Sequence, residues 1–262
     1  MTSFDDWVVH FEANDERHRA TEPLIDWKAP ASMNSRTRRA FVRSLQRFEL
    51  GESGDGAHLL DLAETAGDPA YTAALILLVR EEQKHSALFG RALERLDAVR
   101  LESHWSDAAF TGLRRMLGLR TEIGLFLIAE SVAMGYFVAL AERAPDPVLR
   151  AVGRRIADDE RDHIRFQIDR LRVGFRGTPA PVRALVGVVW GVVAAGAATV
   201  VVVDHGAALR ACDVSPRAYW GRAMRSFRVA ARSVLKDPDA TLVGPARRAS
   251  IQGVARPVSS RA

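Results

Sequence analysis

Two short segments of the chain place a glutamate three residues before a histidine. They read EEQKH at residues 81–85 and DERDH at residues 159–163, so the second is a near copy of the first. On an α-helix, side chains three residues apart lie on one face, about one turn apart. A carboxylate and an imidazole held in this way can share a metal ion, provided that the helix faces a closed interior.

The spacing around these pairs repeats along the chain. A single Glu-x-x-His pair arises easily by chance, but here a further glutamate precedes both pairs at one and the same interval. Glu52 precedes Glu82 by the same number of residues by which Glu130 precedes Glu160. The sequence therefore carries a two-fold internal repeat of candidate metal ligands. They are Glu52, Glu82, His85, Glu130, Glu160 and His163.

Glu49 is a rival to Glu52 as the first ligand. Apolar residues around it recur at three- or four-residue steps, and this stripe includes Glu52 but not Glu49. In the second repeat, the position equivalent to Glu49 is Leu127, whose side chain cannot be a metal ligand. Glu52 is therefore preferred. Three glycines within 51–56 indicate either a bulge beside the site or a break in the helix.

Four long helices are needed to position these ligands. Apolar periodicity predicts them at about 35–66, 69–99, 107–143 and 147–173. Because most of the connections are short, neighbouring helices should run antiparallel. The expected fold class is all-α: an antiparallel four-helix bundle over residues 35–176, with one or two additional C-terminal helices. Residues 1–34 are expected to form an N-terminal lead-in without recognisable chemistry.

The order of the ligands resembles that of the ferritin-like di-iron carboxylate superfamily. In that site one Glu from each of two helices joins a Glu-x-x-His from each of the other two. The resemblance covers all six ligand positions, and the chain is most similar to actinobacterial ferritin-like proteins whose reaction is not known. It implies that each histidine caps one iron, while Glu82 together with Glu130 or Glu160 bridges the pair. The implied cofactor is two Fe ions, and carboxylate and imidazole ligands also suit Mn at one or both positions.

Other residues near these ligands have two interpretations each. Glu81 and Asp159 stand four residues before the two histidines, where either acid can orient a ring nitrogen or lie as a solvated surface charge. Four aromatic residues can shape a pocket beside the metals or belong to the plain core. They are Phe48, Phe89, Phe126 and Phe137.

The resemblance implies an oxidoreductase that activates O₂ to oxidise a small organic substrate, with an electron donor that the sequence does not identify. Two alternatives are a ferroxidase or other iron-handling protein, and a membrane-associated hydroxylase of a lipid-like substrate. A peroxidase with a four-cysteine iron site does not fit, because Cys212 is the single cysteine. A binding protein on a degenerate scaffold fits poorly with six intact ligand positions.

Residues 177–235 lie outside the resemblance. The segment 184–203 carries no charge and is long enough to span a bilayer. Arginines on both sides give almost no bias for orientation, so we expect a helix buried against the bundle or in a homodimer interface. Residues 216–235 are predicted to form a basic amphipathic helix, suited to an exposed face or to peripheral membrane contact. Residues 236–262 are expected to be a disordered basic tail.

The net charge of +5 is concentrated at the C-terminal end. Residues 177–262 hold 12 Lys and Arg against 4 Asp and Glu, whereas residues 1–176 hold 25 against 28. We expect no nucleic-acid partner. One cysteine and the absence of a secretory signal at the amino end indicate a cytoplasmic protein, with membrane association as the alternative.

Overall fold

The helices of the structure occupy most of the chain. The computed structural model describes residues 3–105, 112, 118–236 and 238–245, and within these residues there is no strand. The elements are α1 (Phe4–Thr21), the 3-10 turn η1 (Glu22–Leu24), α2 (Ser35–Glu52), α3 (Ala57–Thr65), α4 (Pro69–Arg95), α6 (Leu119–Arg143), α7 (Pro147–Phe175), α8 (Ala180–Ala211) and α9 (Pro216–Leu235). The predicted all-α class is confirmed.

Three of the long helices begin at a polar residue followed by proline. The side chains of Asp68, Asp146 and Ser215 accept hydrogen bonds from backbone N–H groups in the first turns of α4, α7 and α9. The proline that follows each cap fits the first helical position, where its missing N–H is not needed. The sequence therefore fixes these helix starts locally.

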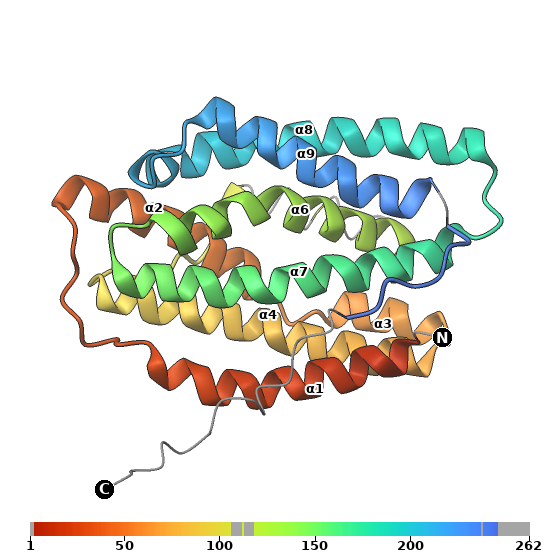
Figure 1. Cartoon of the computed structure of the whole chain (residues 1–262), viewed down its shortest axis with the longest axis horizontal. Coiled ribbons are helices and arrows are strands. Elements are labelled where there is room, and N and C mark those ends of the chain that lie inside the picture. The colour runs from red at the N-terminus through yellow and green to blue at the C-terminus, as the bar shows by residue number, and fades with distance from the viewer. Residues whose placement is uncertain (1–2, 106–111, 113–117, 237, 246–262) are drawn as a thin grey trace, which may run out of the picture.

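The helices lie side by side with their axes roughly along the longest axis of the molecule (Figure 1). α6 and α7 make the most extensive contact, α2 packs on α4, and α4 also packs on α7. α1 covers α4 on one side of the molecule, while α8 and α9 cover α6 on the other side. α1 falls within the predicted lead-in, and the contact between α4 and α7 brings together the two helices that carry the Glu-x-x-His pairs.

The helix predicted over residues 35–66 is broken in the structure. α2 ends at Glu52, and α3 begins only at Ala57. Gly56, between them, has a φ of +68°, which favours glycine over residues with a side chain. A Cβ on Gly56 would also lie 2.9 Å from the methyl groups of Val79. Glu52 therefore stands at the end of a helix, not near the middle of one.

The third predicted helix, at 107–143, is described only from Gly118 onward apart from residue 112. α6 begins at Leu119, and the earlier part of the prediction lies outside the described residues. The other boundaries differ by a few residues: α4 ends at Arg95, and α7 continues to Phe175.

Two helices, α6 and α8, are long and apolar enough to cross a membrane, a property that they share with core helices of soluble proteins. Burial distinguishes them. In the most apolar 18-residue window, 61% of α6 is buried but only 17% of α8. α8 packs on α2, α6 and α9 through residues such as Trp190, Ala194 and Ala198. Of the two predictions for this helix, burial against the bundle holds for one face only, and a homodimer interface stays a prediction.

Candidate metal centre

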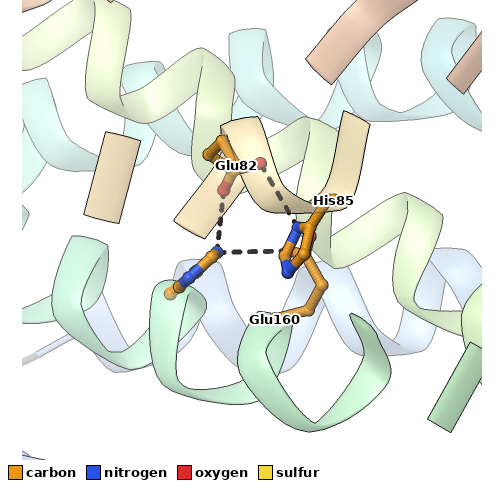
Figure 2. A group of neighbouring side chains, drawn as sticks. Glu82, His85 and Glu160 are labelled. Atoms are coloured by element: carbon orange, nitrogen blue, oxygen red, sulfur yellow. Dashed lines mark ion pairs between the residues drawn. The ribbon is translucent and has the colours of Figure 1, made fainter. Parts of the chain in front are cut away.

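Four of the predicted ligands meet between α4 and α7. The pairs are Glu82 and His85 on α4, and Glu160 and His163 on α7. Their ligand atoms lie within 4.8 Å of one another. Nδ1 of His163 is 2.7 Å from Oε1 of Glu82, and Nδ1 of His85 is 3.5 Å from Oε1 of Glu160 (Figure 2). Each imidazole thus faces a carboxylate of the opposite helix, and this group can hold a metal ion.

The atoms that face one another in this group meet as ion pairs and not as well-aligned hydrogen bonds. They are the buried atoms Nδ1 of His85, Nδ1 of His163, Oε1 of Glu82 and Oε2 of Glu160. Burying several ionisable groups together costs free energy, which such pairs offset only in part. A divalent transition metal fits, because it accepts carboxylate oxygen and imidazole nitrogen together.

Glu52 and Glu130 border this group of four. The carboxyl groups of Glu52 and Glu82 lie close enough to interact, and Gln167 donates a hydrogen bond to Glu130. Burial and the neighbouring carboxylates raise the pKa values of both Glu52 and Glu130 well above the usual range. Four of the six predicted ligands therefore meet in one cluster, while Glu52 and Glu130 lie beside it and are not part of it.

Protons on the two imidazoles compensate for the carboxylate charge of this cluster. Burial alone would lower the pKa of His85, but the carboxylates of Glu160 and Glu82 raise it to about 9. The pKa of His163 is raised well above its usual value, because neighbouring Glu82 and Glu81 outweigh the effect of burial. The imidazoles therefore carry positive charge at neutral pH where a metal ion would otherwise supply it.

The two acids flanking the pairs contact the histidines from outside. Nε2 of His85 lies 3.0 Å from Oδ2 of Asp159, and Nε2 of His163 lies 2.9 Å from Oε2 of Glu81. Each acid thus reaches the histidine of the other helix, not the one four residues later in its own segment. Although burial acts to raise it, the pKa of Glu81 is held at about 2 by His163. This contact leaves Nδ1 of the imidazole to face the centre.

α1 supplies a residue that the sequence analysis missed. Nε2 of His18 lies 3.1 Å from Oδ1 of Asp159. Arg17 contacts the same oxygen, and Arg155 contacts Oδ2 of this carboxylate. Burial, followed by the charge of Arg155, lowers the pKa of His18 to about 3, so this imidazole is neutral. A signal was present in the sequence: the buried face of α1 repeats at helical spacing as Phe4, Trp7, Phe11, Asn14 and His18.

Glu49 is buried but has partners away from the centre. Its Oε1 accepts a hydrogen bond from Ser86 at 3.2 Å and from Arg100 at 3.0 Å. The guanidinium neutralises this carboxylate, whereas Glu52 has only carboxylates and His85 among the principal charges that act on it. Glu49 is thus paired away from the cluster, and the choice of Glu52 as a ligand stays a prediction.

A cavity of about 450 Å³ lies beside the centre. The four glutamates of the centre contribute to its wall, and most of the remaining lining is apolar. Phe48, Phe126 and Phe137 line it, whereas Phe89 instead stacks on Phe48 with ring centroids 5.8 Å apart. Part of the wall comes from α8, outside the four segments that carry the ligands.

His205 gives this cavity a polar group that the sequence analysis left unassigned. It is buried on α8, and its Nδ1 lies 2.7 Å from Oγ of Ser44, which also bonds the hydroxyl of Tyr136. Burial lowers the pKa of His205 to about 3, so the imidazole stays neutral. An isolated histidine in an apolar segment carries no spacing signal, so only the packing of α8 on α2 reveals this contact.

No protein-family model, curated protein or solved structure matches the chain.

Proposed function

We propose that residues 35–176 form a ferritin-like four-helix bundle that binds two iron ions, or iron with manganese, and that the protein is an O₂-dependent oxidoreductase. The observation that carries this proposal is the convergence of two imidazole nitrogens and the carboxylate oxygens of Glu82 and Glu160 between α4 and α7. When bound, such a metal pair supplies the electrons that activate O₂ for oxidation of an organic substrate, which protein side chains cannot do.

The histidines hold one ion each through Nδ1. The outward Nε2 atom of each ring donates its proton to Asp159 or Glu81, which fixes the tautomer and the ring orientation. The neutral tautomer then presents an unprotonated Nδ1 towards the neighbouring carboxylates. Glu81 and Asp159 are therefore positioning residues, and they act through the imidazoles.

Glu82 and Glu160 would be the carboxylates shared by the two ions. Glu82 has oxygens 2.7 Å from Nδ1 of His163 and 3.7 Å from Nδ1 of His85. Glu160 lies 3.5 Å from Nδ1 of His85 and 3.9 Å from Nδ1 of His163. A carboxylate near both imidazoles can serve both ions, so Glu52 and Glu130 are left as the terminal ligands.

The cavity favours an organic substrate over iron handling. Apart from the four glutamates most of its lining is apolar, so an apolar organic molecule gains free energy by leaving water there. Phe48 and Phe137 line this space next to the glutamates. Val193 and Ala197 of α8 extend the apolar wall, which favours a lipid-like substrate among organic molecules.

Iron loading and oxygen uptake test this function. Metal-free protein is loaded with Fe(II) without air and then mixed with O₂, and iron content and O₂ consumption are measured for the wild type and for His85→Ala. We expect O₂ uptake by the loaded wild type and its loss in the variant. His58→Ala is a matched control, because His58 bonds Glu122 on α6 and not the centre.

Excess Fe(II) separates the two candidate functions. An oxidoreductase for organic substrates should not continue to oxidise Fe(II) added beyond about two ions per chain. Sustained oxidation of a large excess, together with a shell-sized assembly in size-exclusion chromatography, would indicate iron storage instead. Full O₂ uptake and iron content in His85→Ala would contradict both assignments of the centre.

A further inference from the structure

The outer face of α8 is a continuous apolar stripe exposed to solvent. Six aliphatic side chains on it have exposed fractions from 47% to 72%. They are Val182, Leu185, Val188, Val189, Val192 and Val203. No charged residue occurs from 184 to 203. Large exposed apolar patches on soluble proteins mark sites that contact a protein or a membrane.

α9 places positive charge along this stripe. Nε1 of Trp220 on α9 donates a hydrogen bond to Oγ1 of Thr199 on α8, and both residues are exposed, so the exposed surfaces of the two helices adjoin. α9 contains no acidic residue. Its exposed arginines are Arg217, Arg222, Arg225, Arg228 and Arg232. We call these arginines, together with the six aliphatic residues of α8 and Trp220, the α8–α9 surface.

We propose that the α8–α9 surface docks the protein peripherally on an anionic lipid bilayer. An apolar stripe beside a basic face is the pattern of helices that lie in the interface plane of a membrane, with the apolar side among acyl chains and the arginines at the headgroups. Arginines close to an anionic surface are attracted to it electrostatically. Trp220 suits the same depth, because its ring is apolar and its N–H is polar.

Other occupants of this surface fit the charges less well. The same surface of a second copy would offer these arginines no acidic partner, because residues 184–203 carry no charge and α9 has no acidic residue. Full insertion of α8 would require it to leave α2 and α6. It would separate Trp190 from Phe175 and His205 from Ser44, which are packed contacts in the fold. Peripheral docking keeps these contacts.

Docking would bring the cavity next to the lipid. Val193, Ala197 and Val200 of α8 line the cavity, while Val192 and Val203 of the same helix lie on the stripe. α8 would then form both a wall of the cavity and the membrane contact. The docking proposal itself does not depend on metal binding.

Co-sedimentation of the metal-free full-length protein with vesicles tests the docking. One set of vesicles is phosphatidylcholine alone, and the other contains a quarter phosphatidylglycerol. We expect binding to the anionic vesicles that weakens with added salt, and at least fivefold weaker binding to the neutral ones. The double variant Val188→Asp/Val192→Asp should reduce binding at least about tenfold, because it places charges in the apolar contact. Val9→Asp is the control, since Val9 is equally exposed on α1.

A charge reversal tests the basic part of the surface. Arg225→Glu should weaken binding to anionic vesicles by about fivefold or more. Arg80→Glu makes the same change in net charge at an exposed position on α4 and should have no such effect. The proposal is overturned if the wild type does not bind anionic vesicles, or if the double aspartate variant binds them as tightly as the wild type does. It is also overturned if light scattering shows a dimer that the double variant dissociates while neither protein binds vesicles.

Discussion

Nε2 of His163 lies 2.9 Å from Oε2 of Glu81, and the two residues belong to different helices. The reciprocal contact joins His85 of α4 to Asp159 of α7 at 3.0 Å. The two hydrogen bonds therefore cross between the helices, and each orients one imidazole while tying α4 to α7. Because the bonds are made on the outside of the centre, both Nδ1 atoms remain available to a metal.

Replacing one of the two acids that contact the histidine of the opposite helix should weaken metal binding without removing a ligand. Glu81→Gln retains the size of the side chain but loses the negative charge that favours a donating Nε2–H on His163. We expect metal affinity to fall about 10–100-fold, measured by competition with a chromogenic chelator. Glu94→Gln on the same helix is the control, because Glu94 is 69% exposed. Equal affinities in both variants and the wild type would show that the contact with Glu81 does not position His163.

Metal binding should release protons at neutral pH. The pKa of His85 is about 9 in the metal-free centre, and the pKa of His163 is also raised, so both imidazoles are protonated at pH 7. A metal ion requires the neutral ring, so apparent affinity should rise with pH up to about 9 and fall as the pH is lowered. Titration calorimetry in buffers of different ionisation enthalpy measures the protons released. A pH-independent affinity with no proton release would contradict this assignment.

Metal should stabilise the fold. At a free metal concentration of about 100 times Kd, binding to the native state adds about 2.7 kcal/mol to the free energy of unfolding. For a chain of this size, this corresponds to a rise in Tm of roughly 5–10 °C. Thermal unfolding followed by circular dichroism, with metal and with excess chelator, measures the difference. His163→Ala should show the lower Tm under both conditions, and a metal-dependent rise in this variant would place the binding site elsewhere.

A larger side chain in the cavity should block small apolar ligands and leave the metals in place. Ala197 lines the cavity from α8, whereas Ala207 lies exposed on the same helix. We expect Ala197→Phe to weaken binding of the neutral fluorophore N-phenyl-1-naphthylamine at least about tenfold, since a ring then occupies the space. Ala207→Phe should bind it like the wild type. Fluorescence titration measures the dye, and metal content should be equal in all three proteins.

The sequence predicts that four of the candidate ligands converge, because their signal is periodic. The constant offset between the two sets of ligands follows from two similar helix pairs, so Glu82, His85, Glu160 and His163 could be placed on facing helices without coordinates. Caps such as Asp68 and Asp146, each followed by proline, also fix where helices begin, because that information is local.

The features that escaped prediction depend on contacts between helices. No local sequence pattern shows which helix Glu81 will face. Its contact with His163, and that of Asp159 with His85, form only when α4 and α7 pack against each other. The contact of His18 with Asp159 likewise joins residues far apart in the sequence. The break at Gly56 was visible as a glycine cluster, but its left-handed backbone was not. For α8, the absence of charged residues does not distinguish a helix that is buried on all sides from one that exposes an apolar face to solvent.

Metal stoichiometry tests the central claim most directly. Protein loaded anaerobically with ⁵⁷Fe(II) and then oxidised should contain about two irons per chain, and Mössbauer spectroscopy should show them as a magnetically coupled pair. His85→Ala and Glu160→Ala should each lose the coupled pair while circular dichroism shows that the helices are retained. A single uncoupled iron in the wild type, or a coupled pair that persists in both variants, would contradict the dinuclear centre between α4 and α7.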